Sequence, residues 1–170
     1  MAEPAAVERL QPSLLDRLTD DTPEATQEGR EKRIMTPAQL RRSVERDLGW
    51  LLNAVHLEAA QSLEAYPEVA RSVVNYGMWD LTGRTVSSIK AGPLEQHLAQ
   101  VIRDFEPRLL PGSIKVRLVV DQDLMSHNAM RFDIQAELWA QPIPLHLFLR
   151  TEIDLESGTV QVTEGDRGGR

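Results

Sequence analysis

The chain has 170 residues, of which 41% are hydrophobic and 26% charged, which suits one globular domain with a buried core and an additional segment. The absence of cysteine excludes disulfides, thiolate metal sites and thiol nucleophiles, and a formal net charge of −7 disfavours binding to nucleic acid phosphates. The apolar runs are too short for membrane insertion and the first residues lack a signal-peptide pattern, so we expect a cytoplasmic protein.

The first predicted element is a short amphipathic helix that begins at Leu14, with Ser13 as a suitable N-cap. Leu10, Leu14 and Leu18 recur every four residues, and Leu15 lies beside them, so one side of the segment is apolar. Because a polar linker follows, this helix has little to bury against within the chain. We expect it to dock on a partner, with folding back onto the chain as the alternative.

The composition divides the chain into three parts. Residues 20–34 are polar and contain Pro, Gly and many charges, which is typical of a flexible linker. We therefore predict an N-terminal amphipathic segment with its linker over residues 1–34, an α+β domain over residues 35–164 and a disordered tail over residues 165–170.

A long helix follows the linker. Thr36 is a good N-cap, Pro37 suits the first helical position and Gln39 completes a capping box. Gly49 interrupts the helix interior, so we expect a neighbour to pack closely there. The basic stretch at residues 41–46 shares the helix with acidic side chains and is interpreted as a solvated face. The apolar stripe of this helix consists of Leu40, Val44, Leu48, Leu51 and Val55.

Two further helices precede the strands. A short one is expected from Pro67 to about Val74, followed by a turn. Another is expected to open at Pro93 and to end near Phe105, because Pro107 disfavours helical angles at the residue before it. The buried stripe of this second helix consists of Leu94, Leu98, Val101, Ile102 and Phe105.

The hydrophobic period then changes from 3.6 to 2. Alternating stretches at residues 113–121, 130–139, 144–155 and 158–164 predict four half-buried strands with one polar face. Helices followed by strands indicate an α+β fold, in which an antiparallel sheet of about four strands packs against the N-terminal helices on one face.

Catalytic and metal-binding patterns are weak. The four histidines, His56, His97, His127 and His146, show no metal-ligand spacing. Asp104 and Glu106 are two residues apart at a helix end, and Arg108 would lower the pKa of Glu106, which is unfavourable for a glycosidase acid. We therefore predict no enzymatic activity, no metal and no cofactor.

The triplet Glu106-Pro107-Arg108 is the most distinctive local feature. Pro107 favours an extended Glu106, and residues two apart in an extended chain point the same way. One interpretation is a structural corner, in which Arg108 reaches back to the free carbonyls of the helix. The other is a pre-organised pair of anchors for an arginine and a carboxylate of a partner. Spacing alone favours neither.

Five stretches together resemble one known family, in the order PSLLDRLTDD, LRRSVERDLGWLLN, YPEVARSVVNYGMWDLTG, FEPRL and EIDLESGTVQV. This order resembles the TssE family, the small baseplate subunits of the bacterial type VI secretion system, and is similar to the wedge protein of contractile phage tails. The resemblance covers about residues 12–163. The YPEV…SVVNYG and FEPRL motifs are specific only in combination.

The resemblance implies a structural role in the cytoplasm, at the inner face of the cell envelope. Family members sit in the baseplate wedge with TssF, TssG and TssK, and the first ring of the TssB/TssC sheath is thought to build on their sheet by strand addition. The family's assembly motif falls on Glu106, Pro107 and Arg108. With the N-terminal leucines as a tether, the predicted partner-binding residues are Glu106, Pro107, Arg108, Leu10, Leu14, Leu15 and Leu18.

Two alternative functions remain open at this point. Wedge domains also resemble a small bacterial stress anti-adaptor, so an adaptor or regulator of the same fold is the second candidate. A lysozyme-like hydrolase is the third, although the carboxylate argument gives it no support.

Overall fold

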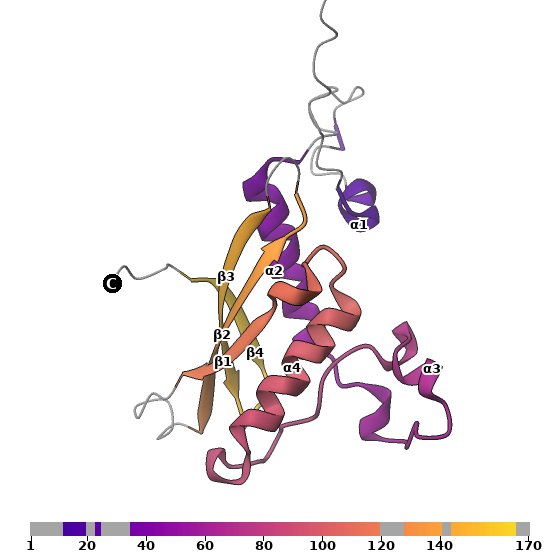
Figure 1. The fold of residues 1–170 in the computed structure, drawn as a ribbon, viewed down its shortest axis with the longest axis vertical. Coiled ribbons are helices and arrows are strands. Elements are labelled where there is room, and N and C mark those ends of the chain that lie inside the picture. Colours follow the sequence, from indigo (N-terminus) through magenta and orange to yellow (C-terminus); the bar gives the residue numbers. More distant parts are fainter. Residues whose placement is uncertain (1–11, 20–22, 25–34, 120–127, 141–143, 166–170) are drawn as a thin grey trace, which may run out of the picture.

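The computed structural model describes residues 12–19, 23–24, 35–119, 128–140 and 144–165. One antiparallel sheet forms one side of the domain, and the helices lie together on the other side (Figure 1). The α+β architecture expected from the sequence is therefore confirmed.

The sheet contains β1 (Lys115–Val119), β2 (Ala129–Leu138), β3 (Leu145–Asp154) and β4 (Val160–Glu164). Its strand order is β1-β2-β3-β4, and every neighbouring pair is antiparallel. Each strand pairs with the strand that follows it in the sequence, so β1 and β4 are the two edges of the sheet. This arrangement explains the period-2 pattern, since one face is buried and the other meets solvent.

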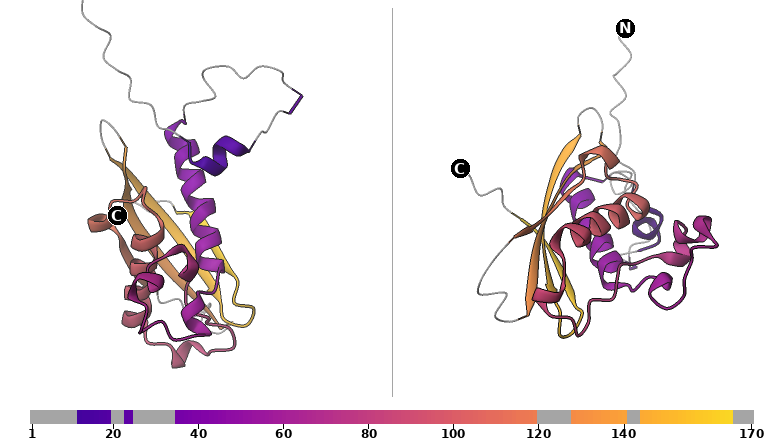
Figure 2. Two further views of the ribbon diagram at one scale, coloured as in Figure 1. Left: turned by 90° about the vertical axis from the view of Figure 1, so that its right-hand side faces the viewer. Right: turned by 60° about the horizontal axis from the view of Figure 1, so that its bottom comes forward.

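The two long helices are α2 (Pro37–Asn53) and α4 (Ala91–Phe105). Figure 2 shows both helices on the same face of the sheet, with α2 against β4 and α4 alongside β1. The capping box of Thr36 and Gln39 is present, with N···O distances of 2.8 and 3.2 Å. Helix α4 begins two residues before Pro93. Proline is tolerated there because the first-turn amides have no helical partner.

The core lies between this helical layer and the sheet. Eight apolar side chains are completely buried at 0% exposure, and they come from both layers: Val44, Leu48, Ile102, Phe132, Ile134, Leu138, Leu149 and Leu155. Two expectations for α2 are wrong. Val55 is 56% exposed, because the helix ends at Asn53. Gly49 has no atom within 4 Å of an added Cβ, so no neighbour packs closely against it.

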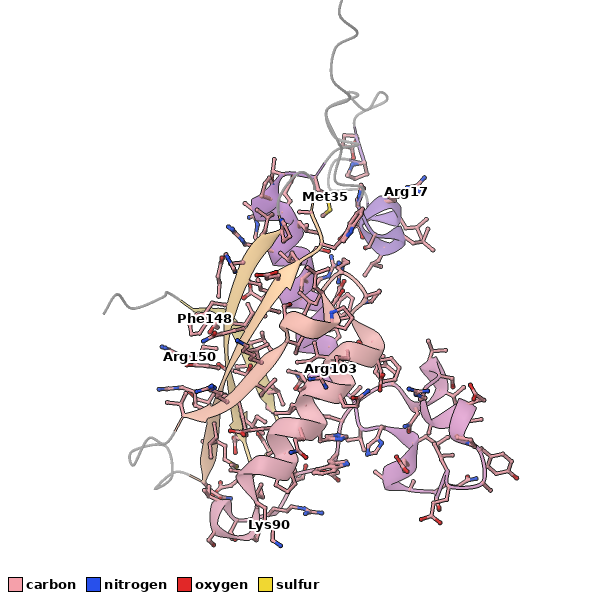
Figure 3. All side chains as sticks on the ribbon, in the orientation of Figure 1. Arg17, Met35, Lys90, Arg103, Phe148 and Arg150 are labelled. Carbon is pink, nitrogen blue, oxygen red and sulfur yellow. The ribbon has the colours of Figure 1, made fainter. Side chains whose placement is uncertain are left out.

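The uncovered face of the sheet is mostly polar, as the alternation predicts, and Phe148 is an apolar exception. Phe148 and Arg150 of β3 point away from the helices (Figure 3). Arg150 lies 3.6 Å from Asp133, and Arg131 lies 3.2 Å from Glu152, so charges of opposite sign pair across the strands.

Shorter elements complete the described chain. The predicted helix at residues 67–74 is split into α3 (Pro67–Ala70) and a 3₁₀ turn (Val73–Asn75), because the Ser72 hydroxyl accepts from the N–H of Val74 and starts a new turn. Three further 3₁₀ turns span Leu57–Ala59, Val86–Ser88 and Pro111–Ser113.

Several sequence predictions fall outside the described residues: Leu10, most of the linker, His127 and residues 166–170. In the part of the chain that is described, no helix is both long and apolar enough to cross a membrane.

Candidate partner-binding site

The N-terminal helix α1 (Leu14–Leu18) forms with the predicted cap. The hydroxyl of Ser13 accepts the N–H of Asp16 at 3.3 Å, and the carboxylate of Asp16 accepts the N–H of Ser13 at 3.2 Å. This reciprocal pair is a capping box with aspartate in the place of glutamate. A helix of five residues is too short to persist alone in water, so contacts with the domain must support it.

Those contacts are polar and come from one residue of α1. The carboxylate of Asp16 accepts a hydrogen bond from Arg46 Nη1 at 2.7 Å and another from Ser43 Oγ at 2.8 Å, both on α2. The Asp16 side chain is only 12% exposed. The helix therefore folds back onto the chain, which is the alternative that the sequence left open.

Most of the apolar side of α1 stays exposed. Leu14 is 71% exposed, Leu15 41% and Leu18 73%, and no residue of α1 is buried. Trp50 of α2 is also 53% exposed, and Arg46 lies over its ring at 5.1 Å. An acidic anchor thus holds α1 in place while its leucines stay exposed.

The triplet lies at the C-terminal end of α4, where Glu106 is the C-cap and is only 3% exposed. Arg108 donates from Nε to Glu106 Oε1 at 2.7 Å and from Nη2 to Glu106 Oε2. The backbone N–H of Arg108 donates to the same carboxylate at 3.1 Å. This two-pronged geometry is the strong form of an arginine–carboxylate pair.

The guanidinium of Arg108 also reaches α2. Nη2 donates to Asp47 Oδ2 at 2.6 Å, and Nη1 donates to Ser43 Oγ at 2.9 Å. Asp47 is paired in turn with Arg46 at 2.7 Å. These contacts join α1, α2 and the triplet into one assembly, called here the charge network: Asp16, Ser43, Arg46, Asp47, Glu106 and Arg108.

The backbone of the triplet forms a turn. The N–H of Leu109 donates to the carbonyl of Glu106 at 3.2 Å, which closes the turn. The N–H of Trp139, just after β2, donates to the carbonyl of Arg108 at 2.7 Å. The triplet therefore connects the end of α4 to the end of β2.

The network shifts the pKa values of its members. Partial burial alone would raise the pKa of the Asp16 carboxyl. Hydrogen bonds from Ser13, Arg46 and Ser43 outweigh this effect and lower that pKa from 3.8 to about 2. Burial alone would lower the pKa of the Arg108 guanidinium, but hydrogen bonds and charges from Glu106 and Asp47 raise it. Both groups stay charged at neutral pH.

The geometry revises three sequence interpretations. The triplet is a turn and not an extended segment. Arg108 reaches the carboxylates of Glu106 and Asp47 and not the helix carbonyls, to which one of the two interpretations assigned it. The basic stretch of α2 is not simply a solvated face, because Ser43 and Arg46 belong to the network. The role of the triplet and the leucines in partner binding is not tested by this geometry and stays a prediction.

The sequence did not identify four members of the charge network as site residues: Asp16, Ser43, Arg46 and Asp47. A local signal existed only for Asp16, which stands three residues after Ser13 in a capping-box pattern. The other three are ordinary polar positions on a long amphipathic helix. Their role depends on what the fold brings beside them.

The histidines form no metal centre in the described part. The ring centroids of His56 and His97 lie 5.7 Å apart, and the ring of Trp79 stacks on that of His97 with the centroids 3.9 Å apart. Burial and the neighbouring His56 lower the pKa of His97 to about 4, which favours the neutral ring. Among the residues with described positions, no group of three or more His, Asp or Glu could hold a metal ion.

Comparison with known proteins supports the structural interpretation. The chain matches the family "Baseplate wedge protein gp25" over residues 38–143, which is more than half of its length. The fold and this match define a structural component of contractile-tail baseplates. The chain belongs to the gp25 baseplate wedge family, of which TssE is the type VI homologue, so the expected family is confirmed. Curated proteins and solved structures gave no match.

Proposed function

We propose that the chain is the small wedge subunit of a type VI secretion baseplate. In this role it binds the TssF–TssG core of the wedge, next to TssK, and helps to nucleate the TssB/TssC sheath. Membership of the gp25 family supports the baseplate role, and the resemblance of the motifs to TssE supports the secretion system.

The observation that carries the proposal is the orientation of α1. Asp16 is bound to α2, whereas Leu14 and Leu18 are 71% and 73% exposed. Two leucines on one turn of a fixed helix offer a ready apolar contact, because binding a partner then orders little additional chain. We propose that this side of α1 packs against the wedge core.

The charge network lies next to this apolar contact. Within it, Asp16, Asp47 and Glu106 carry three negative charges, and Arg46 and Arg108 carry two positive ones. Arg108 already binds two carboxylates and a hydroxyl. The network thus keeps one net negative charge, which favours a basic side chain on the partner.

A pull-down of co-expressed TssF and TssG tests this contact. In the variant Leu14→Ser/Leu18→Ser we expect retention to fall by about tenfold or more, as for truncated hot-spot residues. Both leucines are exposed, so the melting temperature should not change. Val55→Ser is the matched control, because Val55 is 56% exposed and lies outside α1, the triplet and the charge network. Equal retention by the double variant would eliminate α1 as the contact.

The second half of the proposal concerns the edge strand β4. The side chain of Asn53 bonds the N–H of Val160 at 2.9 Å and its carbonyl at 2.7 Å, so these groups point away from β3. Backbone groups alternate along an antiparallel strand, so those of Val162 and Glu164 point outward as well. No partner for these outward groups is found among the described residues. We propose that a sheath strand pairs here.

The variant Val162→Pro tests the edge because it removes an outward-pointing N–H and no hydrogen bond between β3 and β4. We expect it to keep the wedge proteins in the pull-down and to reduce sheath assembly, scored as fluorescent TssB structures in cells. Val162→Thr, which keeps the N–H, should assemble sheath normally. Normal sheath with Val162→Pro would place strand addition elsewhere.

A further inference from the structure

Residues 57–76 form a lobe on the helical side of the molecule. The lobe contains α3 and projects away from the sheet, as the views of Figures 1 and 2 show. It includes the YPEV…SVVNY part of the sequence, and it takes no part in the charge network. The function proposed above therefore leaves this lobe without a role.

The lobe has a fixed internal structure. Asn75 is only 7% exposed, and its side chain accepts from the N–H of Glu58 at 2.9 Å and donates to the carbonyl of Ala70 at 2.9 Å. Ser72 caps the turn that follows it. These bonds tie together the two ends of the lobe and its middle, so the surface side chains stand on a defined backbone.

The lobe joins the domain at its C-terminal end. Gly77, directly after it, has a φ of +124°, and a Cβ added there would lie 2.4 Å from the carbonyl oxygen of Ala54. Only glycine permits this close approach. The ring of Tyr76 packs edge-on against Phe105 of α4 at 5.4 Å, and both side chains pack against the core.

Large apolar side chains nevertheless lie on its surface. Val73 is 81% exposed, Val74 is 61% exposed and Tyr66 is 58% exposed. Val73 and Val74 are adjacent in a single 3₁₀ turn. Two neighbouring exposed valines on a rigid turn contribute nothing to the core, but they could be buried by a partner at little entropic cost.

The charges of the lobe indicate the chemistry of that partner. It carries three exposed glutamates, Glu58, Glu64 and Glu68, against one exposed arginine, Arg71. Glu58 approaches only His56, at 3.9 Å, and no ion pair involves the other three within the described chain. A predominantly acidic lobe that also exposes apolar side chains complements a partner with an apolar pocket and basic residues nearby, and it disfavours pairing with a second, equally acidic copy of itself.

We propose that this acidic lobe is a second docking surface. Its partner is a protein whose apolar pocket, rimmed by lysine or arginine, takes up Val73 and Val74 of this chain. The contact is separate from the leucines of α1 and does not depend on the TssF–TssG assignment. Its partner is a different chain and not a second copy of this one.

Photo-crosslinking of the full chain in its host cell tests the proposal. The probe is a benzophenone amino acid at Val73 or Val74, with the same probe at Glu156, an exposed residue in the β3–β4 turn, as the control. We expect adducts with another protein from the first two positions, mapped beside its Lys or Arg residues. Glu64→Lys or Glu68→Lys should reduce the adduct by about tenfold, whereas Glu156→Lys should not. Each variant should keep the melting temperature of the parent.

Three results would overturn the proposal: no adduct above the Glu156 control, an adduct with a second copy of the chain, or an adduct that the charge reversals leave unchanged. The identity of the captured protein separates this proposal from the baseplate assignment. A partner outside the baseplate that meets the charge criterion supports the lobe, while the leucine variants decide the wedge contact independently.

Discussion

Replacing Arg108 by methionine would remove the cation that joins α4 to α2. The carboxylate of Glu106, only 3% exposed, would lose its strongest partner, and Asp47 would lose one of two guanidinium contacts. Removing one member of a buried ion pair typically costs 3–5 kcal/mol, and because the Arg108 side chain is 23% exposed we expect a value near the lower end, about 3 kcal/mol. For a chain of this length that loss lowers the melting temperature by about 6–12 °C.

Urea unfolding followed by circular dichroism measures this free energy, provided that the denaturant slope stays the same. The variant Glu106→Gln/Arg108→Met should recover part of the loss, because a neutral amide is then buried in place of an unpaired carboxylate. We expect the double-mutant cycle to give a coupling of about 2 kcal/mol. A loss below about 1 kcal/mol for Arg108→Met, the value of an exposed pair, would refute the account of the network.

Four further outcomes follow from the contacts. Asp16→Asn should leave global unfolding within about 1 kcal/mol of the parent but speed hydrogen exchange of the α1 amides, and no change in exchange would mean that Asp16 does not hold α1. Because the folded pKa of Asp16 is about 2 and lies below 3.8, that contact should be complete above pH 3.8 and lost as the pH falls through 2. The lowered pKa of His97 should make stability decline as the pH falls from 6.5 towards about 4, and a pH titration of His97→Gln that keeps this decline would contradict the assignment. In thermal melts Gly49→Ala should stabilise by about 0.5–1 kcal/mol, whereas Gly77→Ala should destabilise by more than that, and the reverse order would contradict the glycine geometry.

Local patterns in the sequence were sufficient for the fold. The alternation in β2 and β3 assigns each side chain to one face, because a period of 2 fits only a strand with one buried side. The caps at Ser13 and Thr36 identify the starts of α1 and α2, since both use contacts within one helical turn. These features require no knowledge of distant residues.

Features that depend on the tertiary structure were missed. The apolar period of α2 continues to Val55, but the helix ends at Asn53. The side chain of Asn53 bonds the carbonyl of Gly49 at 2.7 Å and both backbone groups of Val160 in β4. The sequence could not predict the charge network for the same reason. Asp16 and Arg46 are 30 positions apart, so no periodicity could connect them.

The spacing of Glu106, Pro107 and Arg108 likewise does not distinguish a structural corner from a partner contact. Arg108 and Asp47 are 61 positions apart, so the sequence does not reveal the contact between them that fixes the turn. Because of this contact, the variant Arg108→Glu alone would be a poor probe of partner binding. It would place a third carboxylate next to Glu106 and Asp47, and it would weaken the fold together with any interface.

The most direct test of the baseplate assignment is size-exclusion chromatography of the full chain with co-expressed TssF and TssG from the same genome, with light scattering to measure the mass of each peak. The account predicts one complex that contains all three proteins and loses this chain when Leu14→Ser/Leu18→Ser replaces the parent. Elution of the parent chain as a separate peak, with the TssF–TssG complex intact, would contradict the assignment.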